Sequence, residues 1–365
     1  MMNWLPSAVC SHLMRCRLRV VVLVLVLLPA VCLRADDLRF TRLTDYFEAL
    51  RAQAGIPGLS AIVVGPEDIL WEHAFGQADI GRSISTRINT PFQLDGLTQV
   101  FTAVMTLRCV EEGTLSLSDR IGSFDKDSPD TNATIEQVLT HTSGSPANLV
   151  FSYRPDRLAP LTRVIRACAV GSYRKTLSNL LDRLAMVDSV PGPDAALLQP
   201  PAEGVPTPAV AARYLGVLTR LAQPYAVSPQ GRASLTQYAA TTLTPAGGLI
   251  STVFDLAQFD LALKQGILLR ADTLAAAWRA PVNSAGQRLP HGMGWFVEQY
   301  NGVPIVWQFG SSDEGSSSLL ITVPARGLTM ILLANSNGLS KPFSPNPQEV
   351  TVSPFARVFL GLFVR

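Results

Sequence analysis

Two stretches of the chain place a lysine three residues after a serine, a spacing that suits acyl-transfer chemistry. They are Ser123–Lys126 (SFDK) and Ser172–Lys175 (SYRK). Such chemistry needs a hydroxyl at the start of a helix, a lysine one turn later to take its proton, and backbone amides that hold the oxyanion. The first stretch is acidic and has no apolar helix behind it, and the second is typical of a solvated helix face. Because a four-residue pattern with two free positions often occurs by chance, we interpret both as coincidental.

A third segment has the setting of such a site but lacks both reactive groups. Phe92–Ala103 (FQLDGLTQVFTA) leads into a long apolar helix and carries Gly96 and Gln99 three residues apart. The segment resembles the FxIGSxTKxFTA pattern of class C β-lactamases, low-molecular-weight penicillin-binding proteins and related esterases. The resemblance implies that Gly96 occupies the position of the nucleophilic serine and Gln99 that of the activating lysine. A simpler alternative is that Gly96 fits a tight helix start, with Asp95 capping the amides behind it.

Further motifs of the same family follow in the expected order and rough spacing. They are VEEGTLSLSDRI (110–121), TIEQVLTHTSGS (134–145), TPAGGLISTVFDLAQF (244–259), HGMGWFV (291–297) and LLANSNG (332–338). The resemblance covers most of the chain after about Asp37. It predicts an α+β fold of the β-lactamase and transpeptidase type, with an antiparallel sheet flanked by helices and a mainly helical lobe inserted into it.

The remaining catalytic positions of the family are also altered. Tyr153, in FSYRP, is the best match to the tyrosine of the YxN motif, with Pro155 in place of the asparagine; a packing role for Tyr153 is an equal alternative. On the strand facing the site, WQFG (307–310) puts Gln308 where lysine or histidine is expected and Phe309 where serine or threonine is. His141, in LTHTSGS, matches a stretch that we interpret as structural.

Since nucleophile, base and second cationic position are lost together, we expect a catalytically silent domain. Its cleft would bind a small-molecule or peptide ligand without turnover, through Gly96, Tyr153, Trp307, Gln308, Phe309 and Gly310. Two alternatives stay open: a working esterase, β-lactamase or peptidase with another nucleophile such as Ser123 or Ser172, and a structural or envelope interaction domain. The last alternative predicts a cleft filled by large side chains.

Composition and the N-terminus bear on location and partners. The chain has 365 residues and is 47% hydrophobic, enough for a large core. Arg15, Arg17 and Arg19 precede the apolar run 20–33, typical of a signal peptide and short for a membrane span. We expect export to the periplasm or the cell exterior, with cleavage after Cys32 or Ala35. A retained leader, which would contact the membrane as an anchor, is the alternative.

Several classes of partner and cofactor find no support. Loss of residues 1–35 removes four arginines and no acids, so the formal charge moves from +2 to −2, and no dense basic run indicates nucleic-acid binding. No cofactor motif or metal-ligand spacing is present. Of five cysteines, Cys109 and Cys168 lie beyond the leader, and we expect Cys109 to be a small core residue rather than half of a disulfide.

Patterning predicts the main elements. We expect a surface helix over 38–52, a hairpin of strands 59–65 and 69–75, and a helix over 97–110 buried on most faces. Further helices should follow Thr252 and span 353–364, and strands should cover 303–309, 317–323 and 328–334 with antiparallel pairing. Six prolines between Pro191 and Pro208 predict a loop. The sheet subdomain should comprise 36–90 and 245–365, and the helical lobe 91–244.

Overall fold

The computed structural model describes residue 1 and residues 35–200, 202–312, 315–343 and 349–364. The chain divides into two compact units, residues 1–42 and 43–365. Apart from Met1 and Ala35, the predicted leader lies outside the described residues. Within the described part, no helix is both long enough and apolar enough to cross a membrane.

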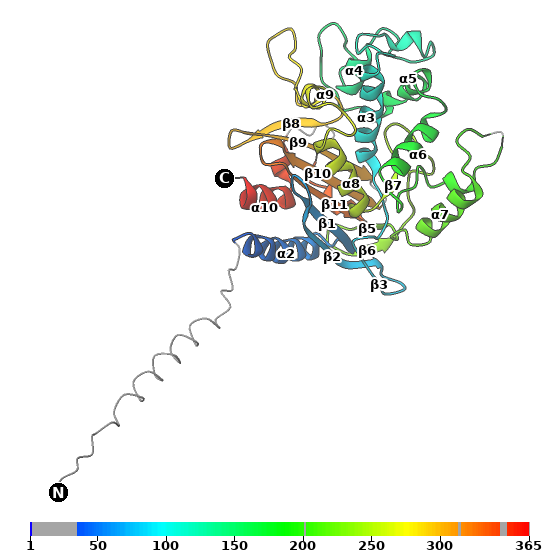
Figure 1. The fold of residues 1–365 in the computed structure, drawn as a ribbon. Helices are drawn as coiled ribbons and strands as arrows, with labels where there is room; N and C mark the ends of the chain where they lie inside the picture. Colours follow the sequence, from blue (N-terminus) through cyan, green and yellow to red (C-terminus); the bar gives the residue numbers. More distant parts are fainter. Residues whose placement is uncertain (2–34, 201, 313–314, 344–348, 365) are drawn as a thin grey trace. The chain divides into compact units, whose positions relative to one another are not determined.

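A seven-stranded antiparallel sheet forms the centre of the second unit, in the order β3-β2-β1-β11-β10-β9-β8 (Figure 1). Its strands are β1 (Gly58–Val64), β2 (Ile69–Asp79), β3 (Ile84–Ser85), β8 (Phe296–Tyr300), β9 (Val303–Ser312), β10 (Ser316–Val323) and β11 (Leu328–Ala334). The predicted hairpin and the antiparallel C-terminal strands are confirmed. Strands from the two ends of the sequence meet where β1 pairs with β11.

The four helices placed from the sequence, α2, α3, α8 and α10, lie close to their predicted positions, and the other helices had not been placed. The described α-helices are α2 (Ala35–Gln53), α3 (Thr98–Glu111), α4 (Ile135–Leu139), α5 (Leu161–Cys168), α6 (Tyr173–Arg183), α7 (Pro208–Leu218), α8 (Val253–Lys264), α9 (Ala271–Ala277) and α10 (Pro354–Phe363). Thr252 caps α8 by accepting a hydrogen bond from the Asp255 amide at 3.1 Å, as its sequence indicates. The proline-rich stretch is a loop containing one short 3-10 turn, η4 (Ala195–Leu197).

Each face of the sheet is covered by helices. On one face α8 packs against β1 and β11, and α3 packs against α8 through Phe101 and Phe259, whose ring centroids lie 4.1 Å apart. On the other, Phe47 of α2 makes edge-to-face contacts with Trp71 of β2 and Phe355 of α10. Apolar rings buried on both sides hold the sheet in place. The structure therefore confirms the α+β class.

Helix α3 is buried over most of its surface, as its all-round apolar sequence predicts. Its N-terminal approach is fixed by a two-stranded sheet, β4 (Phe92–Gln93) with β7 (Ile250–Ser251). The Leu94 amide donates to the Leu249 carbonyl at 2.9 Å and continues this pairing. The chain then enters α3 through the 3-10 turn η1 (Asp95–Leu97), so the position of η1 is set by the core rather than by a loose loop.

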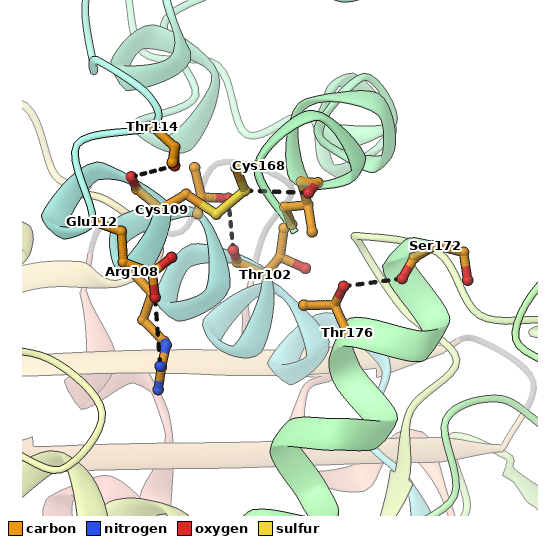
Figure 2. The surroundings of a disulfide bond; sticks show 10 residues. Thr102, Arg108, Cys109, Glu112, Thr114, Cys168, Ser172 and Thr176 are labelled. Carbon is orange, nitrogen blue, oxygen red and sulfur yellow. Dashed lines mark hydrogen bonds and ion pairs between the residues drawn. A yellow bond between two sulfur atoms is a disulfide. The ribbon is translucent and has the colours of Figure 1, made fainter. Parts of the chain in front are cut away.

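A disulfide joins Cys109 of α3 to Cys168 of α5, with a Cα–Cα distance of 5.9 Å (Figure 2). The prediction that Cys109 is an unpaired core residue was therefore wrong. Cys109 is buried, as expected, but α5 packs against α3 and brings Cys168 within bonding distance. Sequence patterning gives the burial of a cysteine, whereas the approach of a second helix depends on tertiary structure.

Candidate functional site

The turn η1 is tied to the sheet by polar contacts from β10. The Ser316 hydroxyl donates to Oδ2 of Asp95 at 2.7 Å, and the Ser318 hydroxyl donates to the Leu94 carbonyl at 2.7 Å. Asp95 has a φ of +47°, an unusual conformation for a residue other than glycine. Its carboxyl group points to β10 and caps neither η1 nor α3, so the proposed capping role of Asp95 was wrong.

Gly96 lies at the centre of the candidate site. A Cβ atom built on Gly96 would stand 3.3 Å from Oη of Tyr153 and 3.3 Å from Nε2 of Gln99. It would also stand 2.5 Å from the carbonyl oxygen of Phe309 on β9, which is closer than real side chains approach a backbone atom. The strand thus occupies the space in which any side chain at position 96 would begin. Glycine is required here by the backbone of a neighbouring strand.

Gln99 links two aromatic residues through its amide. Nε2 of Gln99 donates to Oη of Tyr153 at 2.8 Å, and Oε1 lies 3.1 Å from Nε2 of His141. The Arg154 amide approaches Nδ1 of His141 at 3.3 Å, which makes Nδ1 the acceptor and assigns the ring proton to Nε2. His141 therefore donates to Gln99, which donates to Tyr153. The result is a buried chain of uncharged groups.

Burial keeps this chain uncharged near neutral pH. It lowers the pKa of His141 to about 3, and it raises the pKa of the Tyr153 hydroxyl well above its usual range, although the bond from Gln99 acts in the opposite direction. His291, whose ring lies 4.7 Å from that of His141, also has a strongly lowered pKa because it is buried beside it. Activation of a hydroxyl nucleophile requires a base with a pKa near the working pH, and neither imidazole meets that requirement.

Asp95, the residue before Gly96, also carries a titratable carboxyl group. Burial raises its pKa to about 6, while the hydrogen bond from Ser316 lowers it in part. Because the Asp95 side chain is directed to β10 rather than to Gln99, it does not continue the chain of hydrogen bonds from His141.

The β9 residues predicted to line the cleft are mostly buried. Gln308 is 0% exposed; its Nε2 donates to the Gly294 carbonyl at 3.2 Å and its Oε1 accepts from the Phe309 amide at 2.9 Å. Trp307 is 1% exposed. A Cβ atom on Gly310 would lie 2.1 Å from the Leu94 carbonyl oxygen, so β9 is in close contact with the chain leading into η1 at this point as well.

Aromatic rings fill the space beside Gly96. The Phe309 ring stacks on Tyr153 with centroids 5.6 Å apart and lies 4.9 Å from Phe343. Trp307 in turn stacks on Phe343 and on Phe296. A cluster of large aromatic side chains therefore lies next to Gly96.

The structure brings together Gly96, Gln99, Tyr153 and Phe309 and places the two SxxK strings elsewhere. Ser123 is exposed at the end of a 3-10 turn. Ser172 is the N-cap of α6, and its hydroxyl accepts a hydrogen bond from the Lys175 amide at 3.2 Å. A structural role for the Ser172 hydroxyl is thus visible.

Three participants in the site had not been predicted: His141, His291 and Phe343. Two of the four histidines of the chain fall in stretches that resemble family motifs, THTSGS and HGMGW, and this coincidence was a usable signal. Phe343 follows no motif. Its contact with Trp307 and Phe309 depends on the course of the chain after β11, which sequence periodicity does not determine.

Comparison with known proteins agrees with the fold and the motifs. A penicillin-binding protein 4 from Amycolatopsis lactamdurans is 26% identical over 326 residues, which cover 80% of this chain and 84% of that protein. An octameric penicillin-binding protein homologue from Pyrococcus abyssi superimposes with a TM-score of 0.66 at 19% identity, covering 88% of this chain and 77% of its own. A penicillin-binding protein from Bacillus halodurans superimposes with a TM-score of 0.62 at 19% identity, covering 79% and 95%.

Fold and motifs together define a fold of the β-lactamase and penicillin-binding protein type. The Beta-lactamase family model matches residues 43–351, and the chain belongs to this family. The resemblance inferred from the motifs is therefore confirmed. At this level of identity the solved structures establish the fold alone.

Proposed function

We propose that this protein is a non-acylating member of its family, which acts by binding rather than by turnover. The observation that carries the proposal is the 2.5 Å separation between the Phe309 carbonyl oxygen and the position of a Cβ atom at Gly96. A lost serine alone could be a recent substitution in an otherwise working site. Here the strand has closed over the position, so the backbone itself is adapted to glycine.

The neighbouring side chains support the same conclusion. Gln99 offers an amide where the family has an ammonium group, and its hydrogen bonds connect only uncharged partners, His141 and Tyr153. Phe309, stacked between Tyr153 and Phe343, takes the room of a substrate. The accessible residues here are the half-buried Gly96 and Tyr153 and the exposed Ser311, and we call this surface the mouth of the cleft. A ligand or partner would contact this mouth without being cleaved.

The packed rings also favour a second candidate, a structural or envelope interaction domain, because this alternative predicts a filled cleft. It differs from the first in requiring no small-molecule ligand. Saturable binding of a small molecule beside Gly96 would therefore separate the two.

Restoration of the reactive pair tests the proposal. We expect neither the wild type nor the Gly96→Ser/Gln99→Lys variant to hydrolyse nitrocefin or 4-nitrophenyl acetate above a heat-denatured control. A serine at position 96 must displace the Phe309 backbone before it can react. Hydrolysis by the wild type would contradict the proposal, and the Ser123→Ala and Ser172→Ala variants would then identify an alternative nucleophile. Hydrolysis by the double variant alone would show that the cleft opens readily.

Export is part of the same proposal. The basic flank and apolar run of residues 15–33 support it, and so does the Cys109–Cys168 disulfide, because disulfides persist in oxidising compartments. We propose a periplasmic or extracellular location, with membrane attachment if the leader is retained. The N-terminal sequence of the protein isolated from its native cells tests this: a start after Cys32 or Ala35 indicates cleavage, and an intact Met1 indicates an anchor.

A further inference from the structure

A pocket of about 950 Å³ is lined by residues of the edge strand β8, the end of α9 and the segment that connects them. Figure 1 shows where β8 and α9 lie in the fold. We call it the β8 pocket and define it by Phe151, Trp278, Arg279, Arg288, Leu289 and Glu298. Its volume is at the upper end of the range typical of small-molecule sites, about 300–1,000 Å³. Neither Gly96 nor Gln99 belongs to its lining.

Both arginines of the pocket project from segments fixed by hydrogen bonds. Arg279 lies two residues after the end of α9, and its amide donates to the Ala276 carbonyl at 3.1 Å. Arg288 lies on a small hairpin in which it forms a β-bridge with Val282. Oδ1 of Asn283 closes the hairpin by accepting from two amides of the turn, those of residues 285 and 287. The backbone at Arg279 and Arg288 is therefore held in place, and both side chains are exposed.

The charges of the pocket are unbalanced. Within the described part of the chain, neither Arg279 nor Arg288 has a side-chain hydrogen bond or ion pair, whereas arginines such as Arg174 are paired with a carboxylate. The acid of the lining, Glu298, accepts a hydrogen bond from the Val350 amide at 2.8 Å. The lining therefore has two positive charges, from Arg279 and Arg288, and one negative charge, from Glu298. This net positive charge suits an anion.

The remaining wall is aromatic and apolar. The Phe151 ring stacks on His291 with centroids 6.1 Å apart, and Trp278 makes an edge contact with Trp295 at 6.3 Å. Nε1 of Trp278 is buried and has no hydrogen-bond partner among the described atoms.

We infer that the β8 pocket binds a small organic anion, a carboxylate or a phosphate joined to an apolar ring. The arginines would hold the anionic group, and Phe151, Trp278 and Leu289 would contact the ring. This inference does not depend on the proposed loss of acyl transfer, because the β8 pocket shares no lining residue with the site at Gly96. They are nevertheless neighbours: Phe151 also contacts His141, which is bonded to Gln99.

Isothermal titration with matched probes tests this inference. The probes are 1-naphthyl phosphate, 1-naphthoate and the uncharged 1-naphthalenemethanol, added to the whole protein. We expect at least one anion to bind saturably and the alcohol to bind at least about tenfold more weakly, because the uncharged alcohol cannot form charge-assisted hydrogen bonds with the arginines. Binding of only one anion also supports the inference and identifies the head group. No saturable binding up to about 10 mM, or equal affinity for the alcohol, would overturn it.

Variants locate the binding. We expect Arg279→Gln/Arg288→Gln to weaken anion binding at least about tenfold, and the exposed Arg232→Gln, outside the pocket, to leave it unchanged. Trp278→Phe should remove any quenching of tryptophan emission that the naphthyl ring causes. An unchanged circular dichroism spectrum shows that each variant is folded. Equal affinity of the wild type and the double arginine variant would overturn the assignment of the site.

Discussion

Gln99 holds the buried side chains of the altered site together. Its amide is a donor to Tyr153 and an acceptor from His141, so one side chain satisfies two buried polar groups. A lysine would satisfy the tyrosine but would place a positive charge against a histidine that donates its own proton. Glutamine therefore suits this uncharged site because its side chain can both donate and accept a hydrogen bond.

Removal of that amide should be costly. We expect Gln99→Leu to lower the free energy of unfolding by about 2–4 kcal/mol, because the Tyr153 hydroxyl and the His141 imidazole each lose a buried partner. Gln230→Leu, at an exposed position, should change it by less than about 0.5 kcal/mol. Urea unfolding of the three proteins measures the difference. Equal stability of Gln99→Leu and the wild type would show that the amide contributes nothing.

His141 should make the fold sensitive to acid. Its pKa is about 3 in the folded protein, against 6.5 for an ordinary histidine. Between these values the unfolded chain binds a proton that the folded chain does not, so stability falls by about 1.4 kcal/mol per unit as the pH drops below 6.5. Asp95 and Asp255, whose pKa burial raises to about 6, act in the opposite direction: their protonation favours the folded state between pH 6 and 3.8.

A His141→Asn variant isolates the histidine contribution, because the aspartates are present in both proteins. Asparagine also tolerates the φ of +55° at this position. Between pH 7 and pH 5 the wild type should lose about 2 kcal/mol more stability than the variant. Urea unfolding at the two pH values gives this difference, and parallel losses would mean that His141 titrates normally in the fold.

At the scale of elements, the contact between β9 and η1 sets the character of the site. We expect Gly96→Ala to lower stability by about 1–3 kcal/mol, because its Cβ atom would force the Phe309 carbonyl aside. Gly216, in the last turn of α7, has nothing within 4 Å of an added Cβ atom, and Gly216→Ala should be neutral or stabilising by up to about 1 kcal/mol. Thermal unfolding compares the two. A Gly96→Ala variant as stable as Gly216→Ala would show that β9 yields easily.

The disulfide anchors α3 to α5. It spans 59 residues, for which loop-closure entropy predicts a stabilisation of about 4 kcal/mol. Dithiothreitol should therefore lower the melting temperature of the wild type but not that of Cys109→Ser/Cys168→Ser. A wild type that reacts with iodoacetamide at both cysteines without reductant would show that the bond is absent.

Local signals were enough to predict α2, α3, α8, α10 and five strands of the central sheet, β1, β2, β9, β10 and β11. The Thr252 cap, the apolar run of α3 and the alternating strands near the C-terminus each depend on neighbouring residues, and the structure has them in place. The disulfide was not predicted because it depends on the packing of α5 on α3. The role of His141 was not predicted for a similar reason, because its partners Gln99 and Arg154 come from separate segments of the chain.

At the scale of the whole molecule, the order of the motifs was enough to predict the family, but the state of the cleft was not accessible. The Ser318 hydroxyl and the Leu94 carbonyl that it binds are 224 residues apart in sequence. The distance between β9 and η1 depends on how these two backbone segments are placed in the folded protein. Gly96, Phe309 and Gly310 can be read from the sequence, but only the structure shows how closely β9 approaches η1.

The central claim, that nothing at the start of α3 forms an acyl bond, is tested most directly by the intact mass of the wild-type protein. The folded chain would be incubated with benzylpenicillin and, separately, with a fluorophosphonate, alongside a penicillin-binding protein as a positive control. We predict an unchanged mass for this chain while the control is fully modified. A stoichiometric adduct on the folded chain, mapped to any serine, threonine or tyrosine beside Gly96, would contradict the claim.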